Sequence, residues 1–217
     1  GPGNQYVTAA KKLISGEVRI DMLAGPSELI IIADNSADPA CIAADLLAQA
    51  EHDDQALPVL ISLGQELTER VETELSTQLA DLPTRRTAVA ALQNGGSILA
   101  SDEGAAAGMS DRLAPEHLQI CTRDPSAMQP LLHHYGALFL GESSAEVFGD
   151  YGVGPNHVLP TGTGARATAG LSVMTFLRIQ TWLALDSMTE SYDRMVLDSA
   201  WFARAEGLEA HARAVEL

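Results

Sequence analysis

Glu116 and His117, an acid followed directly by an imidazole, are the two residues of this 217-residue sequence best suited to proton transfer. They stand in the segment LAPEHLQI, just after Pro115, where we expect a strand to begin. A carboxylate and an imidazole at one site accept protons with different basicity, as a reaction that removes protons in successive steps requires. Adjacent strand residues point to opposite faces, so the two side chains can share a pocket only if the backbone is irregular here, which Pro115 favours. The alternative is a structural histidine held by hydrogen bonds.

Nitrogen and oxygen ligands suited to a divalent metal such as zinc are spread along the chain. Gln49 and His52 share one face near the end of a predicted helix, although glutamine rarely binds metals and a histidine there also interacts favourably with the helix dipole. Asp150 opens a glycine-rich stretch, where its carboxylate can reach a metal or a ligand, or can close an Asx turn. Glu206 and His211 stand on a predicted terminal helix at a spacing that does not share one face. Spacing alone does not assemble Gln49, His52, Asp150 and His211 into one site.

Alternating strands and helices with short connections would position these residues. Residues 29–33 form a continuous apolar run, rich in isoleucine, of the kind buried in a parallel sheet. Asp38 is the expected N-cap and Pro39 the first residue of the helix that follows. Further strands are expected at 58–63, 97–101, 117–122 and 137–141, and helices at 38–52, 65–82, 88–93, 103–109 and 125–134. This alternation predicts a three-layer α/β fold around a parallel sheet.

The C-terminal third has a different texture. Residues 149–170 are rich in glycine and too irregular for a core element, and their aromatic and histidine content favours a functional loop. Residues 171–185 are apolar, and residues 189–217 predict one long helix. We expect this helical tail to pack on a partner subunit.

Composition argues against several classes of protein. The formal net charge of −16 is the opposite of what a nucleic-acid surface requires. No apolar run approaches the roughly 20 residues of a membrane span, and no basic region followed by an apolar one marks a secretory segment. Cys41 and Cys121 lack metal-like spacing, which predicts two small buried side chains and a reduced, cytoplasmic setting.

Motifs distributed along the whole chain resemble one enzyme family. In order they are GPGN, DMLAGPSE, QAEHD, LAPEHL, GDYGVGPNHVLPTGTGAR, GLSVMTFLR and AEGLEAHARAV. The chain is similar to the C-terminal half of a histidinol dehydrogenase, the enzyme of the last two steps of histidine biosynthesis. The resemblance implies a Rossmann-like fold and a four-electron oxidation of L-histidinol to L-histidine through histidinaldehyde. Two molecules of NAD would be reduced in succession, in a homodimer with one Zn²⁺ per subunit.

The resemblance also implies a role for each matching residue. His117 would accept the proton of the substrate hydroxyl, and Glu116 would activate water for the second step. The implied zinc ligands are Gln49, His52, Asp150 and His211, the last supplied by the other subunit of the homodimer. The implied substrate contacts are Ser27, Glu206, His117 and the four zinc ligands. Asn4 matches a contact to NAD, and His157 lies in a matching motif with a supporting role only.

This chain departs from the family in its length. The family's chains are about twice as long and carry the rest of the nucleotide site in their N-terminal half. We expect residues 1–26 to be the end of a preceding Rossmann-like domain that is mostly missing here. Residues 27–168 would form the Rossmann-like domain with the zinc and catalytic residues, and residues 169–217 the dimerisation tail. On its own this chain is expected to lack competent NAD binding.

Two other functions stay open. One is a related zinc-dependent dehydrogenase of another small amino or sulfonated alcohol, against which the retention of Glu206 and His211 speaks, because both would face an imidazole-bearing substrate. The other is a zinc-binding or assembly fragment that has no redox activity alone.

Overall fold

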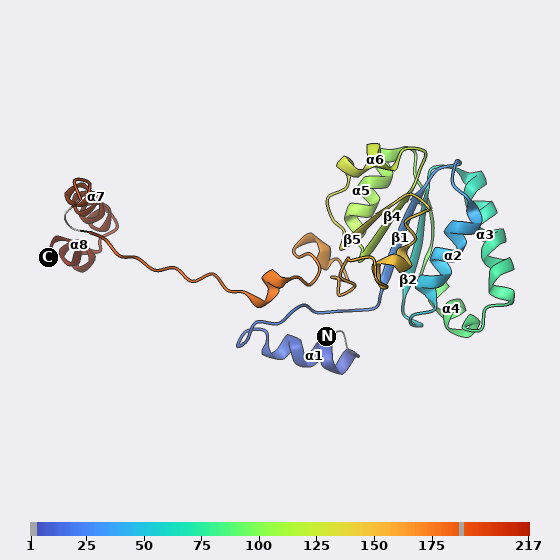
Figure 1. The fold of residues 1–217 in the computed structure, drawn as a ribbon, viewed down its shortest axis with the longest axis horizontal. Helices are drawn as coiled ribbons and strands as arrows, with labels where there is room; N and C mark the ends of the chain where they lie inside the picture. The colour runs from blue at the N-terminus through green and yellow to red at the C-terminus, as the bar shows by residue number, and fades with distance from the viewer. Residues whose placement is uncertain (1–3, 187–188) are drawn as a thin grey trace. The chain divides into compact units, whose positions relative to one another are not determined.

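The chain divides into two compact units, with the boundary between Phe176 and Leu177, and a parallel five-stranded sheet forms the centre of the first unit. The computed structural model describes residues 4–186 and 189–217, and each unit is described by itself. The strands lie in the order β3-β2-β1-β4-β5, and Figure 1 labels β2, β1, β4 and β5 within the sheet. Their bounds are β1 Glu28–Ala33, β2 Leu57–Ser62, β3 Gly96–Leu99, β4 His117–Cys121 and β5 Ala137–Leu140.

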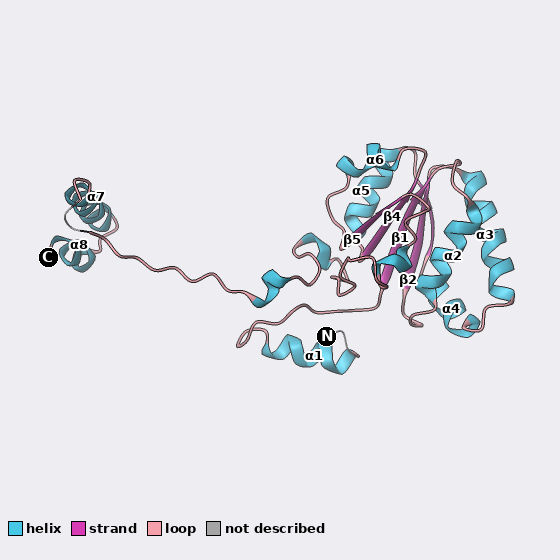
Figure 2. Cartoon of the chain, viewed as in Figure 1, coloured by secondary structure: helices cyan, strands magenta, loops and turns pink. Residues whose placement is uncertain are grey.

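Helices cover both faces of the sheet (Figure 2), which confirms the three-layer α/β fold. On β1 the side chains of Leu29 and Ile31 pack in one apolar cluster with the helices α2 and α3, whereas Ile30 and Ile32 pack in another with α5 and α6. All four are fully buried, which explains why the strand is apolar at every position instead of alternating. Each fully buried side chain of this size contributes about 1.5–3 kcal/mol to folding.

The helices begin where the sequence supplies capping side chains. Asp38 accepts a hydrogen bond from the backbone N–H of Ala40 at the start of α2, and the Asn4 side chain accepts two from the first turn of α1. The α-helices of the first unit are α1 Gln5–Ile14, α2 Pro39–Ala50, α3 Gln65–Ala80, α4 Arg85–Leu92, α5 Glu103–Leu113 and α6 Pro125–Met128. Short 3₁₀ turns are η1 Gln129–Leu131, η2 Glu146–Gly149, η3 Gly164–Arg166 and η4 Val173–Phe176.

Three predicted helices differ from the structure by three or more residues at one end. The helix expected at 125–134 ends at Met128 and continues only as the turn η1, because Pro130 has no N–H to extend the hydrogen-bond ladder. The helix expected at 88–93 already begins at Arg85. The helix expected at 103–109 continues to Leu113.

The tail is a helical hairpin, so the prediction of one long helix over residues 189–217 was wrong. Helix α7 spans Tyr192–Ala205 and α8 spans Glu209–Glu216. Gly207 separates them with a φ of 78°, in the left-handed region that glycine adopts without strain. The Arg204 guanidinium then lies 3.1 Å from the Glu209 carboxylate and 2.7 Å from that of Glu216, which joins the two helices. None of the helices in the described ranges is long and apolar enough to cross a membrane.

Candidate active site

A cavity of about 370 Å³ opens at the amino-terminal edge of the sheet. Strand register places the first residues of β1 and β4 side by side there, since Leu29 pairs with His117. Helix α2 leaves the carboxyl end of β1 and runs back between two parallel strands, so its last turn returns to the same edge. The predicted residues that line the cavity are Ser27, His52, Glu116, His117, Asp150 and His157. The structure therefore brings together residues that lie far apart in the sequence.

The backbone just before β4 is irregular. This is the condition under which the neighbours Glu116 and His117 can line one pocket. Helix α5 ends at Leu113 and is followed by Ala114, whose φ of 46° lies in the left-handed region, and by Pro115. Both side chains then line the cavity, with His117 Nδ1 3.8 Å from Glu116 Oε2. Both residues are buried, so the cavity holds an acid and an imidazole that are largely withdrawn from water.

Glu116 is held by a reciprocal set of hydrogen bonds with Glu28. Glu116 Oε2 accepts from the Ser27 hydroxyl at 2.5 Å and from the backbone N–H of Glu28 at 3.1 Å. The carboxylate of Glu28 in turn accepts from the backbone N–H of Glu116 at 3.3 Å and from that of Gly162 at 2.9 Å. This clasp ties the start of β4 to the start of β1 and to the glycine-rich loop. It also fixes the Glu116 carboxylate at the cavity wall.

Burial moves the pKa values of the pair in opposite directions. The pKa of Glu116 rises from 4.5 to about 7, because burial outweighs the hydrogen bonds from Ser27 and Glu28 that favour the ionised form. The pKa of His117 falls from 6.5 to about 4, because burial disfavours the imidazolium more than the nearby Asp150 carboxylate favours it. At neutral pH His117 is a neutral imidazole that can accept a proton, and Glu116 is poised between its two forms.

His52 and Asp150 come together at the same edge of the cavity. His52 lies in the turn just beyond α2, not on the helix as predicted, and its Nε2 is 3.8 Å from Asp150 Oδ2. Two ligands of one tetrahedral zinc, each about 2.0–2.2 Å from the ion, lie about 3.4 Å apart. The separation of the His52 and Asp150 side chains is close to this value.

Gln49 is fully buried in the last turn of α2, and within the described part of the chain neither amide atom of its side chain has a hydrogen-bond partner. A buried amide without a partner is unusual, and a cation would account for it through coordination by the amide oxygen. Gln49, His52 and Asp150 thus offer oxygen and nitrogen donors whose chemistry fits zinc.

Glu206 and His211 lie in the second unit. Their spacing predicts different faces of one helix, and this prediction is wrong because the two residues belong to two helices. The Gly207 turn puts Glu206 at the end of α7 and His211 on α8, so that both line one hollow of the hairpin. Asn4 caps α1 and is not among the described residues that line the cavity of the first unit.

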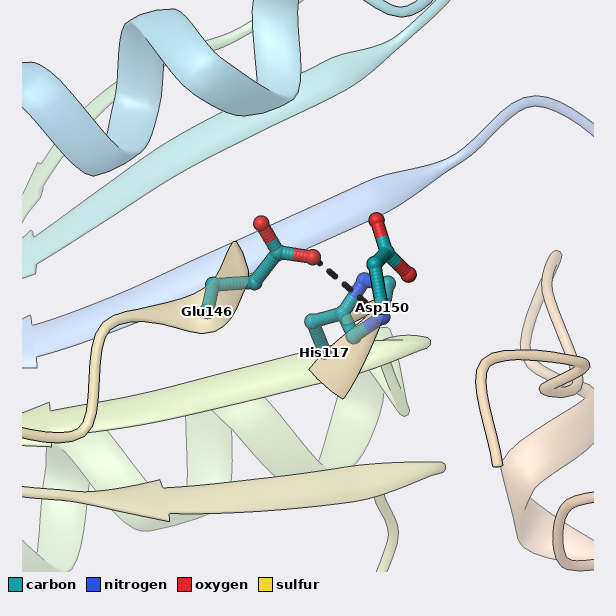
Figure 3. A group of neighbouring side chains, drawn as sticks. All are labelled: His117, Glu146 and Asp150. Atoms are coloured by element: carbon teal, nitrogen blue, oxygen red, sulfur yellow. Dashed lines mark ion pairs between the residues drawn. The ribbon is translucent and has the colours of Figure 1, made fainter. Parts of the chain in front are cut away.

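Glu146, at the start of η2, is a site residue that the sequence did not reveal. It is 1% exposed, and its Oε1 lies 3.4 Å from His117 Nε2. Burial raises its pKa from 4.5 to about 7. His117, Glu146 and Asp150 each offer one ligand atom, and these atoms lie within 4.8 Å of one another (Figure 3). A glutamate in the polar segment GESSAE carries no local sign of burial, so no signal in the sequence could have found it.

Comparison with known proteins identifies the family. The family model described as histidinol dehydrogenase matches residues 1–217. The histidinol dehydrogenase of Thermus thermophilus is 48% identical over 218 residues, which cover 100% of this chain and 52% of that protein. The one from Geobacillus kaustophilus is 46% identical, over 100% of this chain and 51% of that protein.

A solved structure agrees with this result. The crystal structure of histidinol dehydrogenase from Elizabethkingia anophelis superposes with a TM-score of 0.94 at 36% identity, over 100% of this chain and 50% of that one. The chain thus spans about half the length of the relatives it matches. A match over every residue, at this identity, shows that the chain belongs to the histidinol dehydrogenase family.

Proposed function

We propose that this chain carries the acid–base residues of an NAD-dependent enzyme that oxidises L-histidinol to L-histidine through histidinaldehyde. The observation that carries the proposal is that the buried side chains of Glu116 and His117 line one cavity, with pKa values of about 7 and about 4. Two bases of different strength match a reaction in which an alcohol first loses a proton and water is then activated to attack an aldehyde. Membership of the histidinol dehydrogenase family supplies the substrate and the reaction.

His117 serves the first step and Glu116 the second. His117 is neutral above about pH 4, so it can accept the hydroxyl proton of the alcohol as hydride leaves the carbinol carbon. Glu116, ionised above about pH 7 and oriented by Ser27, then takes a proton from the water that adds to the aldehyde. When bound, NAD supplies the hydride acceptor and zinc supplies a positive charge that orients the substrate nitrogen atoms.

Gln49, His52 and Asp150 would hold the zinc, with His211 of the partner subunit as the fourth ligand. The unpaired buried amide of Gln49 and the 3.8 Å separation of His52 and Asp150 support the first three. Glu206 lines the same hollow as His211, which suits a contact to a cationic or hydrogen-bonding group of the substrate. Asn4 would contact the dinucleotide.

A homodimer follows from the same assignment, because His211 would act in the site of the other copy. The second unit supports it independently. Residues 177–186 form neither helix nor strand and expose large apolar side chains, among them Ile179 at 91% and Trp182 at 87%. An extended apolar segment of this kind is typical of an interface. We therefore propose that the tail packs on a second copy of the chain.

Turnover of histidinol tests the proposal. The protein, in the form in which the cell makes it, is mixed with zinc, NAD and L-histidinol, and reduced nicotinamide is followed by its absorbance. We expect turnover of histidinol and none of a sulfonated diol or a simple alcohol. Preference for another alcohol would make the protein a related dehydrogenase. Zinc binding without any reduced nicotinamide would make it a zinc-binding or assembly module, and would refute the proposal.

A further inference from the structure

Glu146 is a buried carboxylate that has no role in the steps proposed above. In the first turn of η2 its side chain points toward His117 (Figure 3). As placed, neither of its oxygens has a hydrogen-bond partner among the described residues, and the Nε2 of His117 lies 3.4 Å from Oε1. A carboxylate withdrawn from water to this degree requires a donor, because burying an unpaired polar group is costly.

The two ring nitrogens of His117 face different carboxylates. Nε2 faces Glu146, whereas Nδ1 lies 3.8 Å from Glu116, which lines the cavity. Within the described chain neither nitrogen makes a close hydrogen bond as the ring is placed. The polar groups near the ring are acceptors, namely the carboxylates of Glu116, Glu146 and Asp150 and the backbone carbonyl of Glu28. A neutral imidazole carries one N–H, and the group that the other nitrogen faces decides which nitrogen that is.

Glu146 is not among the described residues that line the cavity, whereas His117 is. A substrate in the cavity would therefore contact His117 without contacting Glu146. Glu28 and Ser27 already donate to Glu116 through a backbone N–H and a hydroxyl, so Glu116 does not depend on the imidazole for a donor. Glu146 has no such alternative donor among residues 4–186 and 189–217, and the proton of the ring is better placed on Nε2 than on Nδ1.

We propose that Glu146 is a positioning residue that accepts the Nε2–H of His117 and so leaves Nδ1, the nitrogen on the side of Glu116, unprotonated as the proton acceptor. The inference rests on the proposed function, in which His117 is the base of the alcohol step. It assigns the base to one nitrogen of that residue and the orientation of the ring to one carboxylate. Pairing of a histidine base with a buried carboxylate on its other nitrogen is an established way to fix tautomer and orientation.

The test is nitrogen-15 NMR of the protein labelled at its histidines, without substrate or NAD. Chemical shifts of the two ring nitrogens distinguish the Nε2–H from the Nδ1–H tautomer, and the spectrum of His117→Asn assigns the signals. We expect the Nε2–H form of His117 in the wild type. In Glu146→Gln the amide can donate to Nε2, so the Nδ1–H form should gain population, whereas Glu146→Asp should retain part of the wild-type signal.

Kinetics on the same variants provide the second measurement. Glu146→Gln should lower kcat for histidinol about 100- to 1,000-fold, with KM and zinc content near those of the wild type. Glu146→Asp should restore part of the loss. Glu72→Gln, at an exposed position of α3, is the matched control and should leave kcat unchanged. Thermal unfolding of each variant verifies that the fold is retained.

Three results would overturn the inference. They are an Nδ1–H tautomer in the wild type, an unchanged tautomer and kcat in Glu146→Gln, and a loss of zinc from Glu146→Gln that parallels its loss of activity. The last would make Glu146 a metal ligand together with Asp150. Failure of the proposed function looks different, because a wild type that does not oxidise histidinol would still reveal its His117 tautomer by NMR.

Discussion

Replacing Glu116 with glutamine should make the metal-free protein more stable, by an amount that grows with pH. The folded state raises the pKa of this carboxyl from 4.5 to about 7, because it is buried. A group with a raised pKa contributes stability that is fully present below its unfolded pKa and is lost as pH rises through the folded one. For Glu116 the loss runs from pH 4.5 to about pH 7 and is complete above it.

The shift from 4.5 to about 7 corresponds to about 3 kcal/mol of folding free energy. Glutamine does not ionise, and its side-chain oxygen can still accept from Ser27 and from the Glu28 backbone. Glu116→Gln should therefore gain less than about 1 kcal/mol over the wild type at pH 4.5 and about 3 kcal/mol at pH 8.5. Bound zinc would favour the ionised carboxylate, so the metal is removed with a chelator first.

Urea denaturation at several pH values measures the difference directly. The free energies of unfolding of wild type, Glu116→Gln and the exposed control Glu72→Gln are compared at each pH. The control should follow the wild type throughout. Two results would refute the argument that burial of the charged Glu116 carboxylate destabilises the fold. One is a difference in free energy of unfolding between wild type and Glu116→Gln that stays the same from pH 4.5 to pH 8.5. The other is a Glu116→Gln variant that is less stable than the wild type at pH 8.5.

Three further changes test other parts of the site. His117→Asn should abolish oxidation of the alcohol while zinc content stays near normal; a large loss of zinc by metal analysis would instead make His117 a ligand. His211→Ala should lose zinc but keep the circular dichroism of the α/β unit, and a variant that retains full zinc would exclude the tail from the metal site. Glu28→Ala should lower the free energy of unfolding by about 1–3 kcal/mol, because the backbone N–H groups of Glu116 and Gly162 lose their acceptor. Hydrogen exchange at Gly162 should become faster, and unchanged exchange there would show that the hydrogen bond from Gly162 to Glu28 does not hold the loop.

The fold was predictable because its strands and caps are local signals. The run of isoleucines in β1 predicts burial on both faces, and Asp38 with Pro39 marks the start of α2 to the residue. The hairpin of the tail was not predicted, because one left-handed glycine, Gly207, decides between a continuous helix and a turn. Helical periodicity continues on both sides of that residue, so the pattern alone favours one helix.

The site was predictable only in part. The adjacent acid and imidazole of Glu116 and His117 predict a proton-transfer pair, and the structure has the irregular backbone that lets the two side chains line one cavity. Gln49 was a weak candidate from spacing, and only the resemblance to the family gave it a role. Glu146 was missed because its burial depends on contacts between η2 and the sheet edge, which lie far apart in sequence.

The stoichiometry of reduced nicotinamide per histidinol tests the central claim most directly, namely that His117 and Glu116 divide the base work between two steps. A limiting amount of histidinol is consumed to completion with excess NAD, and the products are separated. We predict two reduced nicotinamides and one histidine for the wild type, and early accumulation of the aldehyde with about one reduced nicotinamide for Glu116→Gln. If Glu116→Gln slows both oxidations equally and accumulates no aldehyde, the division of labour between the two residues is contradicted.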